Sequence, residues 1–193
     1  MSADKSDLPT LRVFFAIWPN AEVAACLHTI AQQQHAHLGG RVTRLDTLHA
    51  TLVFIGNVAP DRLPDLLAAA EAVDVPAFQL VLDQAGCWRH NHIAYLGMKQ
   101  VPTALQTLHL ALAVGVRSAG FTIETRAYFP HVTLLRKAAC GEMVCADPES
   151  ENEMENPVHK PVIWSVRDFV LVKSSLDAKG SRYELIGYWR LRM

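Results

Sequence analysis

The chain has 193 residues, of which 50% are hydrophobic and 19% are charged, and its formal net charge is −1. This length and apolar content suffice for one domain with a proper core, or for two tightly joined lobes. No apolar run approaches the roughly 20 residues that a membrane span needs. Residues 1–9 are polar and lack the apolar core of a signal peptide, so we expect a frayed tail there and a cytoplasmic protein with no membrane partner.

Charge is distributed unevenly along the sequence. Residues 142–156 contain six acids and no Lys or Arg, which leaves 18 basic and 13 acidic residues elsewhere, a net charge of +5 on the remainder. A mildly basic body can attract nucleic acid. The acidic, Pro-containing stretch 140–161 has no periodicity and is expected to be a surface loop.

The four cysteines, Cys26, Cys87, Cys140 and Cys145, include no CxxC pair. In a chain of this size that pattern predicts reduced thiols in a cytosolic protein. His90 and His92 near Cys87 resemble part of a metal site but have no fourth ligand nearby, so we expect no metal there.

Hydrophobic periodicity predicts alternating strands and helices. In chain order we expect a strand over 11–18, a helix over 20–38, strands over 41–45 and 47–56, a helix over 60–73, strands over 78–82 and 93–97, a helix over 102–119, and strands over 121–125, 128–137, 164–174 and 181–191. Asn20 is the expected N-cap of the first helix, and Gly39 and Gly40 its end. Strands 78–82 and 93–97 are expected to form a hairpin across 86–91. Gly56 and Asn57 are expected to end the strand that begins at Thr47.

One tetrapeptide pattern occurs twice in this framework, as His49-Ala-Thr51-Leu and His131-Val-Thr133-Leu. Composition alone predicts roughly 0.06 His-x-Thr-Leu matches in the chain. Side chains alternate along a strand, so each His should share a face with its Thr while Ala50 and Leu52 point into the core. The helices that precede the two motifs are of similar length, and the two histidines lie 82 positions apart. This spacing is typical of a duplication, in which two lobes each contribute one strand to a shared cleft.

Two imidazoles across a cleft can divide general-acid and general-base work near neutral pH. The Thr hydroxyls can donate hydrogen bonds to phosphate oxygens, and a nearby Arg can neutralise the phosphate charge. This set of groups suits metal-free cleavage of a phosphodiester, and a strained cyclic one best.

The paired motifs resemble the signature of the 2H phosphoesterase superfamily. The strings Arg12–Ile17, Leu48–Gly56, Phe129–Arg136 and Phe169–Ser175, with Tyr183, make the chain similar to the bacterial RNA 2′,3′-cyclic phosphodiesterases, the LigT-like or 2′-5′ RNA ligase-like proteins. The resemblance implies an α+β fold with two pseudo-symmetric lobes of antiparallel sheet and helices around a central cleft. Periodicity alone supports only a mixed class.

The resemblance also implies an activity. A monomeric RNA-processing enzyme would hydrolyse the 2′,3′-cyclic phosphate of an RNA end, or of a nucleotide, to a 2′-phosphomonoester without cofactor or metal. His49 would protonate the departing 3′ oxygen, His131 would activate water, and Thr51, Thr133 and Arg136 would bind the phosphate. RNA ligation would be only the reverse reaction. Alternatives are a 2H phosphodiesterase for small cyclic nucleotides or 2′-5′ oligonucleotides, and a non-catalytic RNA-binding relative.

Three further residues near the second motif, Arg136, Tyr128 and Phe129, are candidates to contact the substrate. Arg136 lies an odd number of residues after His131, so a bulge or strand end must bring it to the same face. Tyr128 and Phe129 are candidates to stack on the terminal base. Relatives tend to carry Phe-His-Pro-His where this chain has Tyr128-Phe129-Pro130-His131, a departure that changes the hydrogen bonding beside the site.

Overall fold

The computed structural model describes residues 9–140, 160–177 and 180–193. Eight of the described strands form an antiparallel sheet in the order β10-β9-β1-β3-β7-β6-β5, with β2 also paired to β7. β4 (Phe78–Leu82) and β8 (Val162–Val166) form a separate two-stranded sheet. The eight strands are β1 (Leu11–Ile17), β2 (Arg41–Val42), β3 (Ala50–Val58), β5 (Gln84–Trp88), β6 (Ile93–Gly97), β7 (Val132–Arg136), β9 (Asp168–Asp177) and β10 (Gly180–Arg190).

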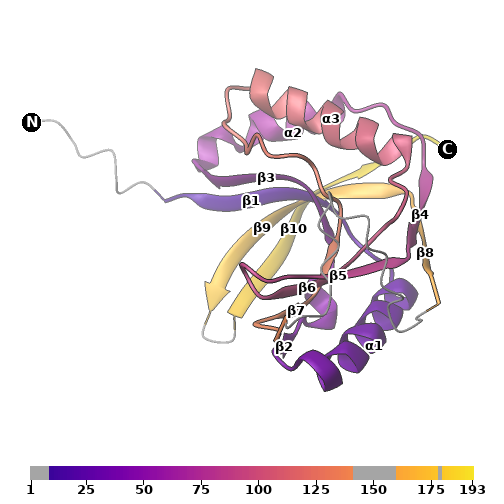
Figure 1. The fold of residues 1–193 in the computed structure, drawn as a ribbon. Coiled ribbons are helices and arrows are strands. Elements are labelled where there is room, and N and C mark those ends of the chain that lie inside the picture. Colours follow the sequence, from indigo (N-terminus) through magenta and orange to yellow (C-terminus); the bar gives the residue numbers. More distant parts are fainter. Residues whose placement is uncertain (1–8, 141–159, 178–179) are drawn as a thin grey trace, which may run out of the picture.

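The large sheet is divided into two lobes at its centre, where β3 and β7 meet. These two strands pair at a single position, Ala50 with Val132. One lobe contains β10, β9, β1 and β3, and the other contains β7, β6, β5 and β2 (Figure 1). This arrangement confirms the α+β class with two lobes of antiparallel sheet.

Three α-helices cover the lobes, and two of them cross from one lobe to the other. α1 (Ala21–Leu38) follows β1 but packs on β2 and β7 of the opposite lobe. α3 (Thr103–Ser118) follows β6 but packs on β3 beside α2 (Leu63–Glu71). The two crossings are reciprocal, as expected for a pseudo-two-fold relation. No described helix is long and apolar enough to cross a bilayer.

The ends of α1 form as predicted. Asn20 accepts a hydrogen bond from the Val23 amide at 2.9 Å, and Gly39 ends the helix with φ 58°. Gly40 has φ 79°, and a Cβ there would lie 2.7 Å from the carbonyl oxygen of Arg136. Only glycine therefore allows the chain leaving α1 to approach β7 and form β2.

The predicted hairpin between 78–82 and 93–97 is wrong. β6 pairs with β5 instead, and β4 pairs with β8. Gly86, where the predicted connection 86–91 begins, lies within β5 opposite Tyr95, and a Cβ at this position would collide with the Tyr95 ring. The glycine thus serves close packing inside a strand rather than chain reversal.

Other element boundaries also differ from prediction. Gly56 does not end β3, which continues to Val58; the register shift against β1 beside Gly56 indicates a bulge. Residues 121–125 form no strand, although buried Ile123 anchors them to the core. The stretch 164–174 is split between β8 and β9, and 60–73 is a 3₁₀ turn (Pro60–Arg62) followed by α2.

The prediction of reduced thiols is wrong for two cysteines. Cys87 on β5 and Cys140, which follows β7, form a disulfide with a Cα–Cα distance of 5.7 Å, and Cys26 is free and exposed. Fifty-three positions separate the bonded pair, so the sequence offered no local motif for it. Cys145, most of the predicted 1–9 tail and most of the predicted 140–161 loop lie outside the described residues.

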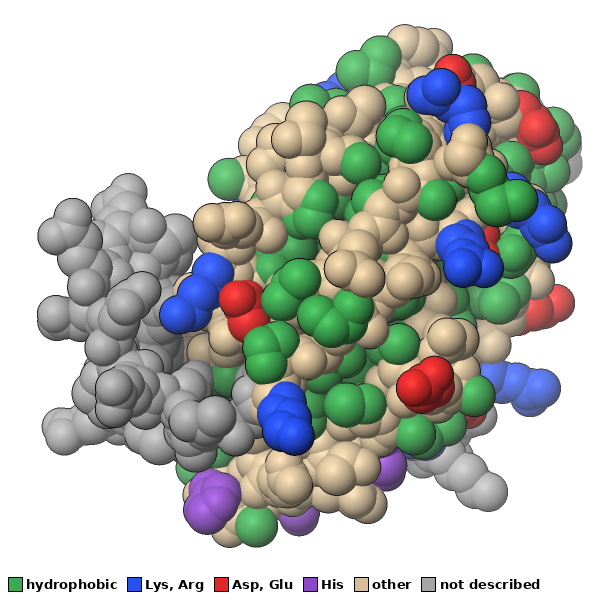
Figure 2. Space-filling model, turned by 90° about the vertical axis from the view of Figure 1, so that its right-hand side faces the viewer, with side chains coloured by type: hydrophobic (Ala, Val, Ile, Leu, Met, Phe, Trp, Pro, Cys, Tyr) green, Lys and Arg blue, Asp and Glu red, His purple; other side chains and the backbone are tan. Residues whose placement is uncertain are grey.

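The outer face of the β4–β8 pair lies on the side of the molecule turned to the viewer in Figure 2. Burial alternates along both strands of this pair: Leu80 and Trp164 are buried, whereas Val81 and Ile163 are exposed. Among the described residues on this side, basic and acidic side chains are scattered singly and form no large charged patch (Figure 2).

Candidate active site

The two His-x-Thr motifs lie at the junction of the lobes. Each histidine lies one residue before its strand, since β3 begins at Ala50 and β7 at Val132. Extending the antiparallel match of these two residues by one position sets His49 opposite Thr133 and His131 opposite Thr51. Ala50, Leu52, Val132 and Leu134 are buried, which confirms the predicted parity of both motifs.

Both imidazoles are held by the same local hydrogen bond. His49 Nδ1 lies 2.7 Å from the carbonyl oxygen of Thr47, and His131 Nδ1 lies 2.9 Å from that of Phe129, in each case two residues earlier. A carbonyl oxygen only accepts, so each Nδ1 must carry the proton and donate it. In the neutral rings Nε2 then has a free lone pair, as a general base requires.

Both histidines favour the neutral form. Burial lowers the pKa of His49 to about 4, with smaller contributions from the charges of His131 and Arg136. The pKa of His131 is also lowered, chiefly by burial and then by Arg126 and Arg136. The Nδ1 hydrogen bonds raise both values but do not offset burial. The histidines influence each other electrostatically, and Arg136 acts on both.

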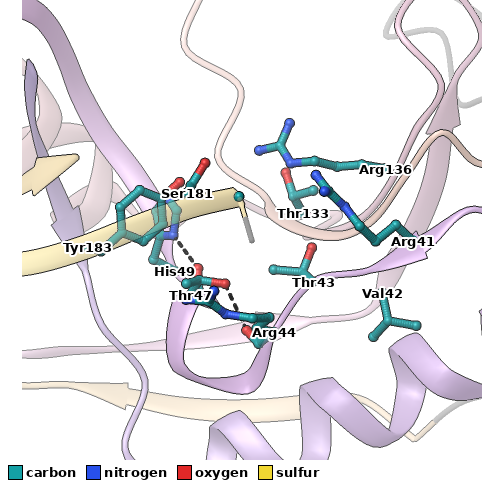
Figure 3. Close-up of a pocket in the computed structure, with 11 residues that line it drawn as sticks. Arg41, Val42, Thr43, Arg44, Thr47, His49, Thr133, Arg136, Ser181 and Tyr183 are labelled. Atoms are coloured by element: carbon teal, nitrogen blue, oxygen red, sulfur yellow. Dashed lines mark hydrogen bonds between the residues drawn. The ribbon is translucent and has the colours of Figure 1, made fainter. Parts of the chain in front are cut away.

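A pocket opens beside His49 on the β2 side of the junction (Figure 3). Its lining combines four kinds of group: the imidazole, three arginines, four hydroxyl side chains and the Tyr183 ring. The residues are Arg41, Val42, Thr43, Arg44, Thr47, His49, Thr133, Arg136, Gly180, Ser181 and Tyr183. His131 and Thr51 are not among them, and His49 lies across the pocket from Arg41 and Arg136 (Figure 3).

Arg136 reaches this pocket through a bulge in β7. Tyr95 pairs with Thr133 but Ala94 pairs with Leu135, which leaves Leu134 as an extra residue. The bulge restores Arg136 to the face of Thr133, and both side chains line the pocket. The expectation that Arg136 needs a bulge is confirmed.

Each histidine is packed among three aromatic rings of its own lobe. His49 is stacked on Trp18, with 5.3 Å between ring centroids and an angle of 6°. His131 meets Trp88 edge-on at 4.6 Å. The other rings are Phe14 and Tyr183 around His49, and Tyr95 and Phe129 around His131. These rings exclude water, which is the physical cause of the lowered pKa values.

Tyr128 lies in a different setting from the one suggested by a base-stacking role. Its ring stacks on His109 of α3 at 3.8 Å, and its hydroxyl donates to the Thr51 carbonyl at 3.4 Å. His109 Nδ1 in turn donates to the Leu52 carbonyl at 2.8 Å. Burial lowers the pKa of His109 and raises that of Tyr128. The pair supports the backbone of the first His-x-Thr motif; stacking of a base on Tyr128 or Phe129 remains a prediction.

Several site residues were not predicted as such from the sequence. Thr43 and Ser181 reach the pocket from segments that carry no motif, Thr47 lies two residues before the first motif, and Trp18 and Trp88 contact the histidines. Pairing of β2 with β7 brings Thr43 to the site, and pairing of β10 with β9 brings Ser181 there. Across residues 9–140, 160–177 and 180–193, no three His, Cys, Asp or Glu side chains converge as a metal-binding set.

The sequence is similar to a family model and to proteins of the same kind. Residues 17–95 match the family model described as LigT like Phosphoesterase. The chain is 32% identical over 182 residues to the RNA 2′,3′-cyclic phosphodiesterase of Escherichia coli, a match that covers 93% of this chain and 96% of the relative. A Thermus thermophilus protein of the same name is 26% identical, covering 94% and 91%.

Solved structures agree with the sequence matches. The crystal structure of E. coli LigT complexed with 3′-AMP superposes with a TM-score of 0.82 at 30% identity, covering 96% of this chain and 100% of that one. The apo form of the same enzyme gives a TM-score of 0.79, also at 30% identity, over 95% and 99% of the two chains. With the paired motifs at the junction of two lobes, these matches show that the chain belongs to the LigT-like phosphoesterase family.

Proposed function

We propose that this protein is an RNA 2′,3′-cyclic phosphodiesterase that produces 2′-phosphomonoester ends. The observation that carries the proposal is the pair of Nδ1-protonated imidazoles, each opposite the threonine of the other motif and next to a basic pocket. The names of the E. coli and T. thermophilus relatives support the same reaction.

In the proposed step, His131 Nε2 removes a proton from water as the water oxygen attacks phosphorus. Protonated His49 Nε2 donates its proton to the departing 3′ oxygen as the phosphorus–oxygen bond breaks. The product carries a 2′-phosphate, and proton exchange with water restores both rings. Thr51, Thr133 and Arg136 donate to the phosphoryl oxygens, where charge develops.

The lowered pKa of His49 makes its protonation depend on substrate. In the free protein a pKa of about 4 leaves the ring neutral near pH 7. A bound phosphate places a negative charge beside the imidazoles and neutralises Arg136, and both effects raise the pKa values. The acid is therefore charged mainly when there is a leaving group to protonate.

The proposal includes a single domain that works as a monomer in the cytoplasm, with an RNA end as its partner and no cofactor. Its test is incubation with a short RNA that ends in a 2′,3′-cyclic phosphate, in excess EDTA, followed by identification of the terminal phosphate. A 2′-phosphate is expected. An unchanged end, a 3′-phosphate or a requirement for metal would contradict the proposal.

A further inference from the structure

The basic part of the pocket contains two arginines placed directly opposite each other. Arg41 of β2 and Arg136 of β7 are cross-strand partners, and both line the pocket. Figure 3 shows their guanidinium ends on the Thr133 side, across from His49. Like charges in this position destabilise a strand pair. Neither arginine has an ion-pair partner among the residues that the structure describes.

The other two arginines near the site are already engaged. Arg44 binds Asp46 through two hydrogen bonds of 3.0 and 3.2 Å. Arg126, in the segment before His131, pairs with Glu124 at 2.6 Å. Arg41 is thus a pocket cation whose charge is not balanced within the described part of the chain.

Hydroxyl groups accompany the two arginines. The buried Thr43 hydroxyl lines the pocket and has no hydrogen-bond partner in the described residues. Ser181 of β10 lies on the opposite wall, next to Gly180, where a Cβ would come within 3.7 Å of an Arg41 nitrogen. A buried hydroxyl without a hydrogen-bond partner costs free energy, which a ligand that accepts a hydrogen bond from it would recover.

One phosphodiester does not account for this set of donors. It carries a single negative charge, which Arg136 next to Thr133 can balance at the reacting phosphate. Arg41 and Thr43 lie across the pocket from His49, and Ser181 lies on the His49 side (Figure 3). In an RNA chain the next negative charge is the phosphate on the 5′ oxygen of the terminal nucleoside.

We infer that Arg41 and Thr43, with Ser181, form a second phosphate subsite that binds the 5′ phosphate of the terminal nucleotide. The inference rests on the proposed function, and it names the preferred substrate class: cyclic-phosphate ends that carry a further phosphate, either the internucleotide phosphodiester of RNA or a 5′-phosphate. Nucleosides with the cyclic phosphate alone would react through the histidine centre but bind more weakly.

Three substrates test this inference: cytidine 2′,3′-cyclic phosphate, its 5′-phosphorylated form, and the dinucleotide CpC ending in a 2′,3′-cyclic phosphate. The wild-type kcat/KM should be at least about tenfold higher for each of the last two, because a charge-assisted hydrogen bond is gained. Arg41→Gln should remove most of this preference and leave the first substrate nearly unchanged. Thr43→Val should reduce the preference by a smaller factor.

The exposed Arg167, between β8 and β9, gives a matched control; Arg167→Gln should keep the preference intact. Ratios between substrates are measured on one preparation, so partial misfolding does not change them. An equal loss on all three substrates in Arg41→Gln would place Arg41 on the reacting phosphate and overturn the inference. So would a wild-type enzyme without preference, or one that favours only the dinucleotide. Hydrolysis of none of the three would instead contradict the proposed function.

A binding measurement provides a readout besides activity. Arg41→Gln removes a like charge opposite Arg136, so its melting temperature without ligand should equal or exceed that of the wild type. Stabilisation by inorganic pyrophosphate should be smaller in the variant than in the wild type. Equal stabilisation of both proteins would count against the subsite.

Discussion

The His49 half and the His131 half of the site share their chemistry but differ in their surroundings. Each ring donates from Nδ1 to the carbonyl two residues earlier, and each is packed among three aromatic side chains. Yet the segment before His49 forms β2 and brings Arg41 and Thr43 to the pocket, whereas residues 121–125 form no strand. Under the proposed function, the reaction uses the symmetric part of the fold, and substrate orientation depends on the asymmetric part.

The largest expected effect is loss of either imidazole. His49→Ala and His131→Ala should each keep the fold and lower turnover at least about a hundredfold, since general acid or base catalysis contributes that much or more. Steady-state kinetics and circular dichroism check this. His37→Ala, at an exposed position in the last turn of α1, is the matched control and should leave turnover nearly unchanged. Wild-type activity in either of the first two variants would contradict the assignment of one histidine as general acid and the other as general base.

The second prediction concerns the Cys87–Cys140 disulfide, which lies in the His131 half of the described structure. Cys87 is adjacent to Trp88, which contacts His131. The chain-entropy model for a crosslink across 53 positions gives an upper value of about 4 kcal/mol. Cys87→Ser and Cys140→Ser should therefore each lower the free energy of unfolding by up to that amount, as measured by urea denaturation, whereas Cys26→Ser should not. Equal stability of all three variants would show that the crosslink adds nothing.

A third prediction separates the two threonines. Thr133 lines the pocket and Thr51 does not. Thr133→Val should lower kcat about tenfold to a hundredfold, because it removes a donor to the developing charge. Thr51→Val should lower kcat by a smaller factor. The reverse order, measured on the same cyclic-phosphate RNA, would place the reacting phosphate on the His131 side of the junction.

The smallest effect is a displacement of the pH profile. Both imidazoles have lowered pKa values, so the base stays neutral to lower pH and the protonated acid is lost at lower pH as well. Both limbs of the kcat/KM profile, which reports the free enzyme, should move to the acid side of the ordinary value of about 6.5. The kcat profile should lie at higher pH, because bound phosphate raises the pKa values. A kcat/KM maximum above pH 7.5 would contradict the neutral state of the free site.

Sequence patterns were sufficient to identify the paired His-x-Thr motifs and most elements. His49 and His131 stand out because a short repeated pattern with fixed parity encodes both the strand and the chemistry. The need for a bulge at Arg136 also followed from parity alone. Local patterns could not assign partners, however, which is why β4 was matched with the wrong strand.

The predictions for the 86–91 connection and for the cysteines are wrong for related reasons. Gly86 begins the stretch 86–91 predicted to connect a hairpin, but its role depends on Tyr95 across the strand pair. The Cys87–Cys140 bond and the pocket contributions of Thr43 and Ser181 likewise depend on segments brought together only by folding. Long-range contacts of this kind leave no local trace in the sequence.

The protonation of the two imidazoles is the most direct test of the account, and ¹⁵N NMR of the histidine rings at pH 7 measures it. In the free protein both His49 and His131 should be neutral, with the proton on Nδ1. Saturation with adenosine 2′-monophosphate should protonate at least one of the two rings at Nε2. A charged ring in the free protein, a proton on Nε2 of either neutral ring, or no response of either ring to the nucleotide would contradict the account.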